Sequence, residues 1–247
     1  MSVRRYLIVN ADDFGQSPGV NRGIIEAHEH GIVTSTSLMV RWPAAAEAVE
    51  YVRKRPGFSL GLHIDLGEWV YRDENWTPLY QVVPLDDVAA VKEEISRQLA
   101  AFRNLAGRDP THIDSHQHVH LREPARSVAV EAAQKLRVPL RECSRDVRYC
   151  GRFYGQTAEG SPYPEGITTG ALIEILAHLQ PGITELGCHP SAGQDLDTTY
   201  LHERAQEVKA LCDARVRSAV VHMGIDLCPF TAVRDLSDHF GVATAKK

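Results

Sequence analysis

The sequence lacks the features of several protein classes. Its five cysteines are odd in number and none has C-x-x-C spacing, which argues against both a disulfide framework and a thiolate zinc site. The first apolar run, residues 6–9, is too short for a signal-peptide core or a membrane span. A formal net charge of −5 gives no general basic field for a phosphate backbone. We therefore expect a soluble cytoplasmic protein that binds neither membranes nor nucleic acid.

What the chain does have is the composition of an ordinary globular domain. Of its 247 residues, 43% are hydrophobic and 24% are charged, and no linker interrupts them. Apolar runs and segments of helical periodicity alternate along the chain, which predicts an α/β fold with a parallel sheet. Since about seven such units close or nearly close a barrel, we expect a distorted (β/α) barrel over residues 1–240 and a flexible tail at 241–247.

The expected elements follow from this periodicity and from capping signals. Strands are predicted at residues 6–9, 32–40, 58–64, 111–115, 139–143, 183–188 and 225–227. Helices are predicted from Ser17-Pro18 to Gly31 and at 43–55, 84–106, 123–136, 168–179, 203–211 and 214–222. Residues 68–80 and 149–166 are expected to be loops, because they are rich in turn residues and aromatics.

Acids and histidines gather where the predicted strands end. Asp12 and Asp13 follow the first strand, His63 ends the third, His116 follows the fourth, and His189 follows the strand at 183–188. In a parallel barrel these ends share one face, which is where functional groups collect. Packing alone gives little reason for polar groups at four separate strand ends.

The adjacent acids Asp12 and Asp13 have two interpretations. Two neighbouring carboxylates in a confined site repel each other unless a cation or a proton compensates them, and a metal bound to one would leave the other free as a base. The alternative is that the pair merely caps the following helix or forms an Asx turn. The sequence leaves both open.

His63 and His189 are each ambiguous when taken alone. Alternation in an extended segment puts His63 and Asp65 on one side, so Asp65 is a candidate for orienting the imidazole. A single histidine in a strand is, however, more often structural than a ligand. His189 precedes Pro190 and is either an ordinary residue at a strand end or an acid that titrates near neutral pH.

The segment at residues 111–120 is the strongest local signal. In an extended chain, spacing of two places five polar groups on one side, although a bend after Ser115 would divide them: His112, Asp114, His116, His118 and His120. A surface histidine tract is the alternative. The interleaved Asp, Ser and Val favour a metal site, because neutral imidazole is a common ligand for zinc and similar ions.

Six ordered motifs make the chain resemble the YdjC-type carbohydrate deacetylases over nearly its whole length. The motifs are LIVNADDFG (7–15), GIVTST (31–36), GLH (61–63), THIDSHQHVH (111–120), FYG (153–155) and PGITELGCHP (181–190). The resemblance implies a distorted (β/α) barrel related to polysaccharide deacetylases. It also implies removal of an N-acetyl group from an amino sugar or sugar conjugate, and it is compatible with a homodimer.

The resemblance assigns roles to individual residues. It implies one divalent metal ion held by Asp13, His63 and His116, with Mg²⁺ or Zn²⁺ expected first and Co²⁺, Ni²⁺ or Mn²⁺ as options. Asp12 would be the general base, His189 the acid, and Arg141 a support for the acetyl group or the base, although the two aspartates are interchangeable at this stage. Residues expected around the ligands or the substrate are Asp65, Asp114, His118, His120, Phe153 and Tyr154, with Trp69, Tyr71 and Trp76 as further stacking surfaces for sugar rings.

Two other functions remain open at this point. A metal-dependent hydrolase of another bond, such as a phosphoester, would use the same ligands but would be expected to gather more Lys or Arg. A catalytically silent sugar-binding or metal-binding protein would need neither Asp12 beside Asp13 nor His189. The segments 68–80 and 158–167 match no family motif, so specificity for chitooligosaccharides is not carried over.

Overall fold

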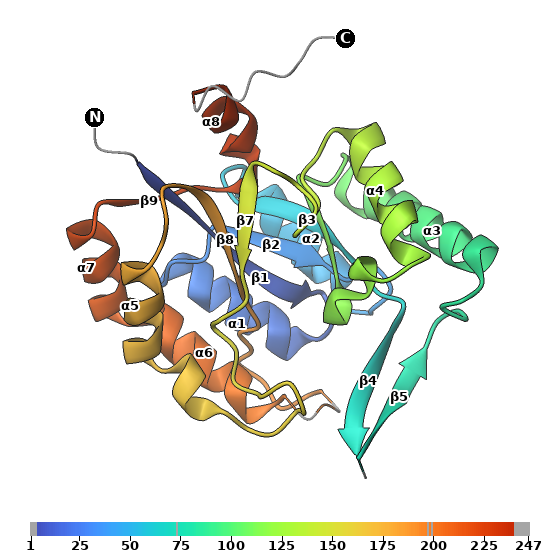
Figure 1. Cartoon of the computed structure of the whole chain (residues 1–247), viewed down its shortest axis with the longest axis horizontal. Coiled ribbons are helices and arrows are strands. Elements are labelled where there is room, and N and C mark those ends of the chain that lie inside the picture. The colour runs from blue at the N-terminus through green and yellow to red at the C-terminus, as the bar shows by residue number, and fades with distance from the viewer. Residues whose placement is uncertain (1–3, 73, 197, 199, 240–247) are drawn as a thin grey trace.

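A curled parallel sheet forms the centre of the computed structural model (Figure 1), which describes residues 4–72, 74–196, 198 and 200–239. The sheet has seven described strands. Six of them run in the order β6-β3-β2-β1-β8-β7, and the seventh, β9, pairs with the first part of β1. Their bounds are β1 (Arg5–Phe14), β2 (Ser35–Leu38), β3 (Ser59–Ile64), β6 (Ile113–Ser115), β7 (Val147–Cys150), β8 (Gly182–Cys188) and β9 (Ile225–Leu227). The sheet curls into a half-barrel, as the sequence predicted.

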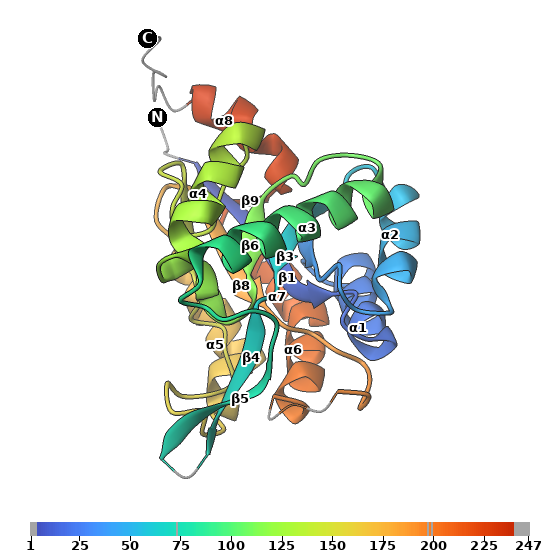
Figure 2. The ribbon, with the colours of Figure 1, turned by 90° about the vertical axis from the view of Figure 1, so that its right-hand side faces the viewer.

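Helices cover the outer face of this sheet (Figures 1 and 2). They are α1 (Pro18–Glu29), α2 (Ala45–Arg53), α3 (Val88–Ala106), α4 (Ala125–Leu136), α5 (Thr169–Ala177), α6 (His202–Cys212), α7 (Ala214–His222) and α8 (Val233–His239). Helix α1 begins as predicted, because the Ser17 hydroxyl accepts the amide of Val20 and Pro18 opens the first turn. Helix α3 buries Val91, Ile95 and Phe102, an apolar face with helical spacing.

The predicted strand at 139–143 is wrong, and β7 lies partly in a predicted loop. Of the predicted strand, Leu140 alone forms a parallel bridge, with Ile113. The Ser144 hydroxyl accepts the amide of Leu140, and the amide of Cys143 turns back onto the Leu140 carbonyl, so the backbone leaves the sheet after one residue. Pairing resumes at Val147, which lies beside Ile183 of β8.

The predicted loop at 68–80 is a β-hairpin that projects from the half-barrel (Figure 2). Strands β4 (Gly67–Arg72) and β5 (Asn75–Gln81) pair in antiparallel register, with Tyr71 opposite Trp76. Pro78 within the second strand is compatible with this pairing only because it sits in an edge strand. The prediction of a loop at 68–80 is therefore wrong.

The remaining predictions concern the C-terminal tail, the extent of the domain and membrane-spanning helices. The tail predicted at 241–247 lies outside the described residues, and the single domain over residues 1–240 stays a prediction. None of the described helices combines the length and the hydropathy of a membrane span.

We expect Gly61→Ala to destabilise the protein by about 1–3 kcal/mol, measured by urea unfolding, because it overpacks the core. A Cβ at Gly61 would lie 2.4 Å from Nε2 of His112. That ring stacks on Phe230 with centroids 3.7 Å apart, so it has little room to yield. Gly57→Ala is the matched control, since a Cβ there meets nothing within 4 Å. Equal stability losses in the two variants would contradict the packing argument.

Candidate active site

A bulge at the end of β1 turns both adjacent aspartates towards the same cavity. Ala11 pairs with Thr36 and Phe14 with Leu38, so β1 carries one residue more than β2 across this interval. In a regular strand, Asp12 and Asp13 would point to opposite faces. The extra residue and the left-handed backbone of Asp13, with φ of 67°, bring both carboxylates to the cavity wall. A non-glycine residue in this conformation is strained, which is typical of functional sites.

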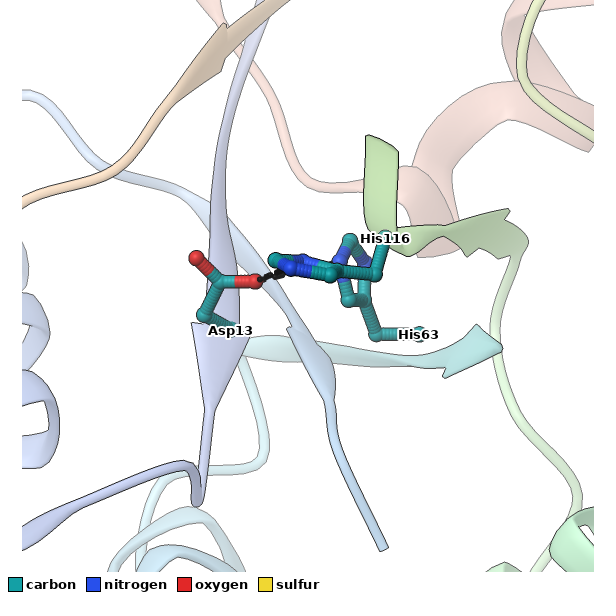
Figure 3. Close-up of side chains that lie close together, drawn as sticks. All are labelled: Asp13, His63 and His116. Carbon is teal, nitrogen blue, oxygen red and sulfur yellow. Dashed lines mark hydrogen bonds and ion pairs between the residues drawn. The ribbon is translucent and has the colours of Figure 1, made fainter. Parts of the chain in front are cut away.

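Asp13, His63 and His116 converge at this point (Figure 3). Oδ1 of Asp13 lies 3.2 Å from Nε2 of His63 and 3.0 Å from Nδ1 of His116. Nδ1 of His63 lies 2.8 Å from Oδ1 of Asp114, so it donates to that carboxylate and presents a free lone pair on Nε2 when the ring is neutral. Nε2 of His63 and Nδ1 of His116 are thus the two buried imidazole nitrogens that face the same oxygen of Asp13. Donor atoms of this kind fit a cation.

Electrostatics supports the same conclusion. Burial by itself lowers the pKa of His63, but the carboxylates of Asp114, Asp13 and Asp12 raise it to about 9. Burial likewise lowers the pKa of His116, and Asp13 and Glu68 together raise it well above its usual value. The cluster therefore requires positive charge, which either protons on the imidazoles or a divalent cation would provide.

The three-residue group fits a metal better than the alternative group of Asp12, His63 and Asp114. In both groups the donor atoms lie within 4.8 Å of one another. Arg141, however, donates to both oxygens of Asp12 at 2.6 and 2.7 Å and lies 2.9 Å from Oδ2 of Asp114. Asp13 has one oxygen, Oδ1, that meets imidazole nitrogens only, so Asp13 is the better ligand.

Arg141 is the centre of the buried charge network. Its side chain is 1% exposed, and Nε donates to Glu185 on β8 at 2.8 Å while the terminal nitrogens reach Asp12 and Asp114. Burial would raise the pKa of Asp12, but Arg141 outweighs burial and holds it below its usual value. Asp12 is consequently ionised at neutral pH.

Arg204 and Glu207 of α6 are site residues that the sequence did not reveal. Arg204 is buried and donates to Oδ2 of Asp13 at 2.7 Å. Oε2 of Glu207 accepts the backbone amide of His189, and Oε1 accepts the Tyr200 hydroxyl. Burial raises the pKa of Glu207 to about 8. No local motif marks these two residues. The buried face of α6 carries three charged side chains, Glu203, Arg204 and Glu207, beside Ala210 and Leu211, so an apolar stripe does not identify that face from the sequence.

His189 lies beside Asp12 as the resemblance implied. Its Nε2 is 3.7 Å from Oδ2 of Asp12, and its Nδ1 is 4.0 Å from Glu207. Burial lowers the pKa of His189 to about 4. The rings of Tyr154 and Tyr200 stack 4.6 Å apart, and both meet the imidazole at an angle.

Asp114, rather than Asp65, orients His63. Asp65 instead accepts hydrogen bonds from Arg41, Trp42 and Tyr80, the last of which lies on strand β5 of the hairpin. The strand β6 ends at Ser115, so alternation does not continue through the histidine cluster. A 3₁₀ helix, η1 (His116–Leu121), follows instead.

The other histidines of the cluster point to different places. His112 is buried against Phe230, away from the acids. His118 faces the Tyr149 hydroxyl at 3.4 Å, and Nδ1 of His118 lies 3.3 Å from Glu142. His120 bonds the Ser115 hydroxyl and the carbonyl oxygen of Arg141, so it holds the segment that carries that arginine.

The cluster of Asp13, His63 and His116 opens into a cavity of about 720 Å³. Aromatic side chains from the hairpin, from β7 and from the segments that follow β7 and β8 line its walls: Trp69, Tyr71, Trp76, Tyr149, Phe153, Tyr154 and Tyr200. Phe153 is only 1% exposed and packs in the core, so it offers little face to a sugar. Tyr154 and Trp76 are exposed and offer more.

Solved structures with the same architecture define the class of fold. A protein of Enterococcus faecalis named for cellobiose-phosphate cleavage is 27% identical, with a TM-score of 0.73 over 93% of this chain and 99% of that chain. A family 4 carbohydrate esterase from Streptomyces lividans, solved with acetate, is 16% identical, with a TM-score of 0.55 over 92% and 93% of the two chains. The fold is therefore that of the polysaccharide deacetylases, as expected.

The chain belongs to the YdjC-like family, whose model matches residues 6–222. A relative from Serratia marcescens, named chitooligosaccharide deacetylase, is 33% identical over 92% of this chain and 99% of its own length. The resemblance drawn from the six motifs is confirmed.

We expect Arg141→Ala to lower the free energy of unfolding by about 3–5 kcal/mol at neutral pH, because it leaves three carboxylates buried without their partner. In the wild type, Asp12 and Asp114 have pKa values below their usual value of 3.8, so their stabilisation is present above about pH 4 and is lost as the pH falls. In the variant, burial raises those pKa values, so acid relieves the repulsion. Urea unfolding at about pH 7 and pH 4.5 should show the difference between the two proteins shrinking.

Arg103→Ala is the control for this measurement. Arg103 pairs with Asp109 on the surface, where both side chains are about half exposed, so its loss should cost no more than about 1 kcal/mol. A penalty for Arg141→Ala that does not change with pH would contradict the buried charge network.

Proposed function

We propose that the protein is a metal-dependent carbohydrate deacetylase that hydrolyses the N-acetyl group of an acetylated amino sugar or sugar conjugate. The observation that carries the proposal is the convergence of Asp13, His63 and His116, in which one nitrogen of each buried imidazole faces the same oxygen of Asp13, beside the arginine-bound Asp12. The name of the Serratia marcescens relative supports the same chemistry. The cavity of about 720 Å³ is large enough for sugar rings.

Asp13, His63 and His116 would hold the metal. A divalent cation bound there would supply Lewis acidity, which polarises an amide carbonyl and makes water more acidic. Three protein ligands leave coordination positions for water and substrate. Arg204 binds the second oxygen of Asp13 and thereby fixes the direction of the first.

Asp12 and His189 are the proposed base and acid. Asp12 is ionised and held by two hydrogen bonds from Arg141, so it is oriented to accept a proton from water. His189 lies 3.7 Å from the same carboxylate, which gives the proton a short path towards the leaving amine. Because a pKa of about 4 leaves His189 neutral at neutral pH, His189 would first take this proton and then pass it to the amine.

The positive groups of the site argue against a phosphoesterase. Arg141 and Arg204 line or support the cavity, but each already binds carboxylates. A phosphate would therefore meet less positive charge than the number of arginines indicates. A panel of acetylated sugars and phosphoesters separates the two activities, and binding without acetate release would identify a silent sugar-binding protein.

Metal identity, assembly and location stay predictions. Mg²⁺ and Zn²⁺ come first, and Co²⁺, Ni²⁺ and Mn²⁺ also suit one carboxylate and two imidazoles. An oligosaccharide substrate, a homodimer and a cytoplasmic location are the accompanying proposals. Elemental analysis and light scattering of the purified protein address the metal and the assembly.

We expect His63→Ala and His116→Ala each to lose stoichiometric metal and to lower acetate release by roughly a hundredfold or more, because each removes an imidazole ligand. Elemental analysis and an acetate assay measure the two effects. His222→Ala, an exposed histidine at the end of α7, is the matched control and should behave as the wild type. Full activity in either ligand variant would overturn the proposed site.

Asp12→Asn should keep the metal and lower the rate by about 10²–10⁴-fold, because it removes the base without removing a ligand. Asp13→Asn should lose the metal. The same two assays distinguish them. The opposite pattern, with metal lost from the Asp12 variant alone, would mean that the two aspartates have exchanged roles.

A further inference from the structure

The two proposed histidine ligands, His63 and His116, share one kind of contact and differ in another. One ring nitrogen of each faces Asp13, whereas the other ring nitrogen has a hydrogen-bond partner only in His63. Each presents one nitrogen to Oδ1 of Asp13: Nε2 of His63 at 3.2 Å and Nδ1 of His116 at 3.0 Å. The second nitrogen of His63 is held by Asp114 at 2.8 Å. The second nitrogen of His116 is buried and has no hydrogen-bond partner, and the carboxylate that it faces is Glu68, with Oε2 3.6 Å away.

Glu68 is held in place by its own contacts. It lies near the start of β4, is 7% exposed, and accepts the Thr198 hydroxyl on Oε1 at 3.2 Å. The pairing of β4 with β5 changes register between Glu68 and Trp69, which is where a bulge redirects side chains. Oε2 is the oxygen left to face the imidazole.

The same strand is attached to the segment that carries His116. Oε1 of Gln117 accepts the amide of Trp69 at 2.9 Å, and Nε2 of Gln117 donates to the carbonyl of Trp69 at 2.8 Å. Gln117 and His118 both have left-handed backbones, with φ of 47° and 54°. Two adjacent strained residues persist only when the surroundings stabilise them. Two hydrogen bonds from one side chain therefore join the hairpin to the ligand segment.

We propose that Glu68 is a positioning residue that accepts the Nε2 proton of His116 and so orients Nδ1 towards the metal, an inference that rests on the proposed function. Metal-binding histidines commonly donate their second nitrogen to a carboxylate, which fixes the tautomer and makes the ligating nitrogen more basic. In this role Glu68 accepts the proton of the second nitrogen of His116, as Asp114 accepts that of the second nitrogen of His63. The hairpin that carries the cavity aromatics Trp69 and Tyr71 thus also stabilises the metal site.

The test is Zn²⁺ affinity of the metal-free full chain, measured by competition with a chromogenic chelator in Glu68→Ala and Glu68→Gln. We expect Kd to rise about 10–100-fold in the alanine variant. The rise should be smaller in the glutamine variant, whose amide oxygen still accepts a hydrogen bond. In the Zn²⁺-loaded wild type labelled with ¹⁵N-histidine, the His116 Nε2 proton should exchange slowly with solvent. That protection should be lost in Glu68→Ala.

Glu47→Ala is the matched control, because it removes an exposed carboxylate from the first turn of α2 and leaves the contacts of Glu68 and His116 unchanged. Its Kd should stay within about twofold of the wild type, with thermal unfolding confirming that all variants fold. Unchanged Zn²⁺ affinity in Glu68→Ala, or an equal loss in Glu47→Ala, would overturn the role of Glu68 while leaving the metal site intact. A wild type that binds no Zn²⁺, Co²⁺ or Mg²⁺ would overturn the proposed function and this inference together.

Discussion

Buried negative charge at the carboxyl ends of the strands is the constraint on which the rest of the site depends. Asp12, Asp114 and Glu185 come from β1, β6 and β8, and all three surround one guanidinium. Carboxylates removed from water are costly unless paired, so Arg141 between them stabilises these three strand ends. Its side chain also connects β6 with β8, which are not neighbours in the strand order.

The same network gives the two adjacent aspartates different chemistry. Arg141 occupies both oxygens of Asp12, whereas Arg204 occupies one oxygen of Asp13 and leaves the other to the imidazoles. Two carboxylates that are neighbours in the chain thus meet different cations, which supports the proposed roles of base for Asp12 and ligand for Asp13. Arg141 lies between α4 and β7, and Arg204 lies in α6. The side chains that distinguish Asp12 from Asp13 therefore come from segments that are far from β1 in the sequence.

The cavity walls combine the hairpin, which matches no family motif, with the FYG motif of the segment after β7. The hairpin β4–β5 supplies Trp69 and Tyr71, and the segment after β7 supplies Tyr154. These side chains face the space into which a sugar would extend, so they govern which acetylated substrate the proposed deacetylase accepts. Gln117 makes two hydrogen bonds with the backbone of Trp69 and so joins the hairpin to the segment that carries His116. The aromatic wall of the cavity and the proposed metal site are therefore directly connected.

Local signals in the sequence determined the parallel α/β architecture, most helix positions and the identity of the acids and histidines, because periodicity and strand-end placement need only neighbouring residues. They missed the hairpin and β7, where pairing depends on partners elsewhere. They also made Asp65 the candidate partner of His63, since alternation considers a single strand, whereas the partner is Asp114 of β6. Only the tertiary structure decided that pairing, the different partners of Asp12 and Asp13, and the presence of Arg204, Glu207 and Glu68 near the site. The reason is that pKa values and ligand geometry arise from charges brought together by folding, which residue spacing does not record.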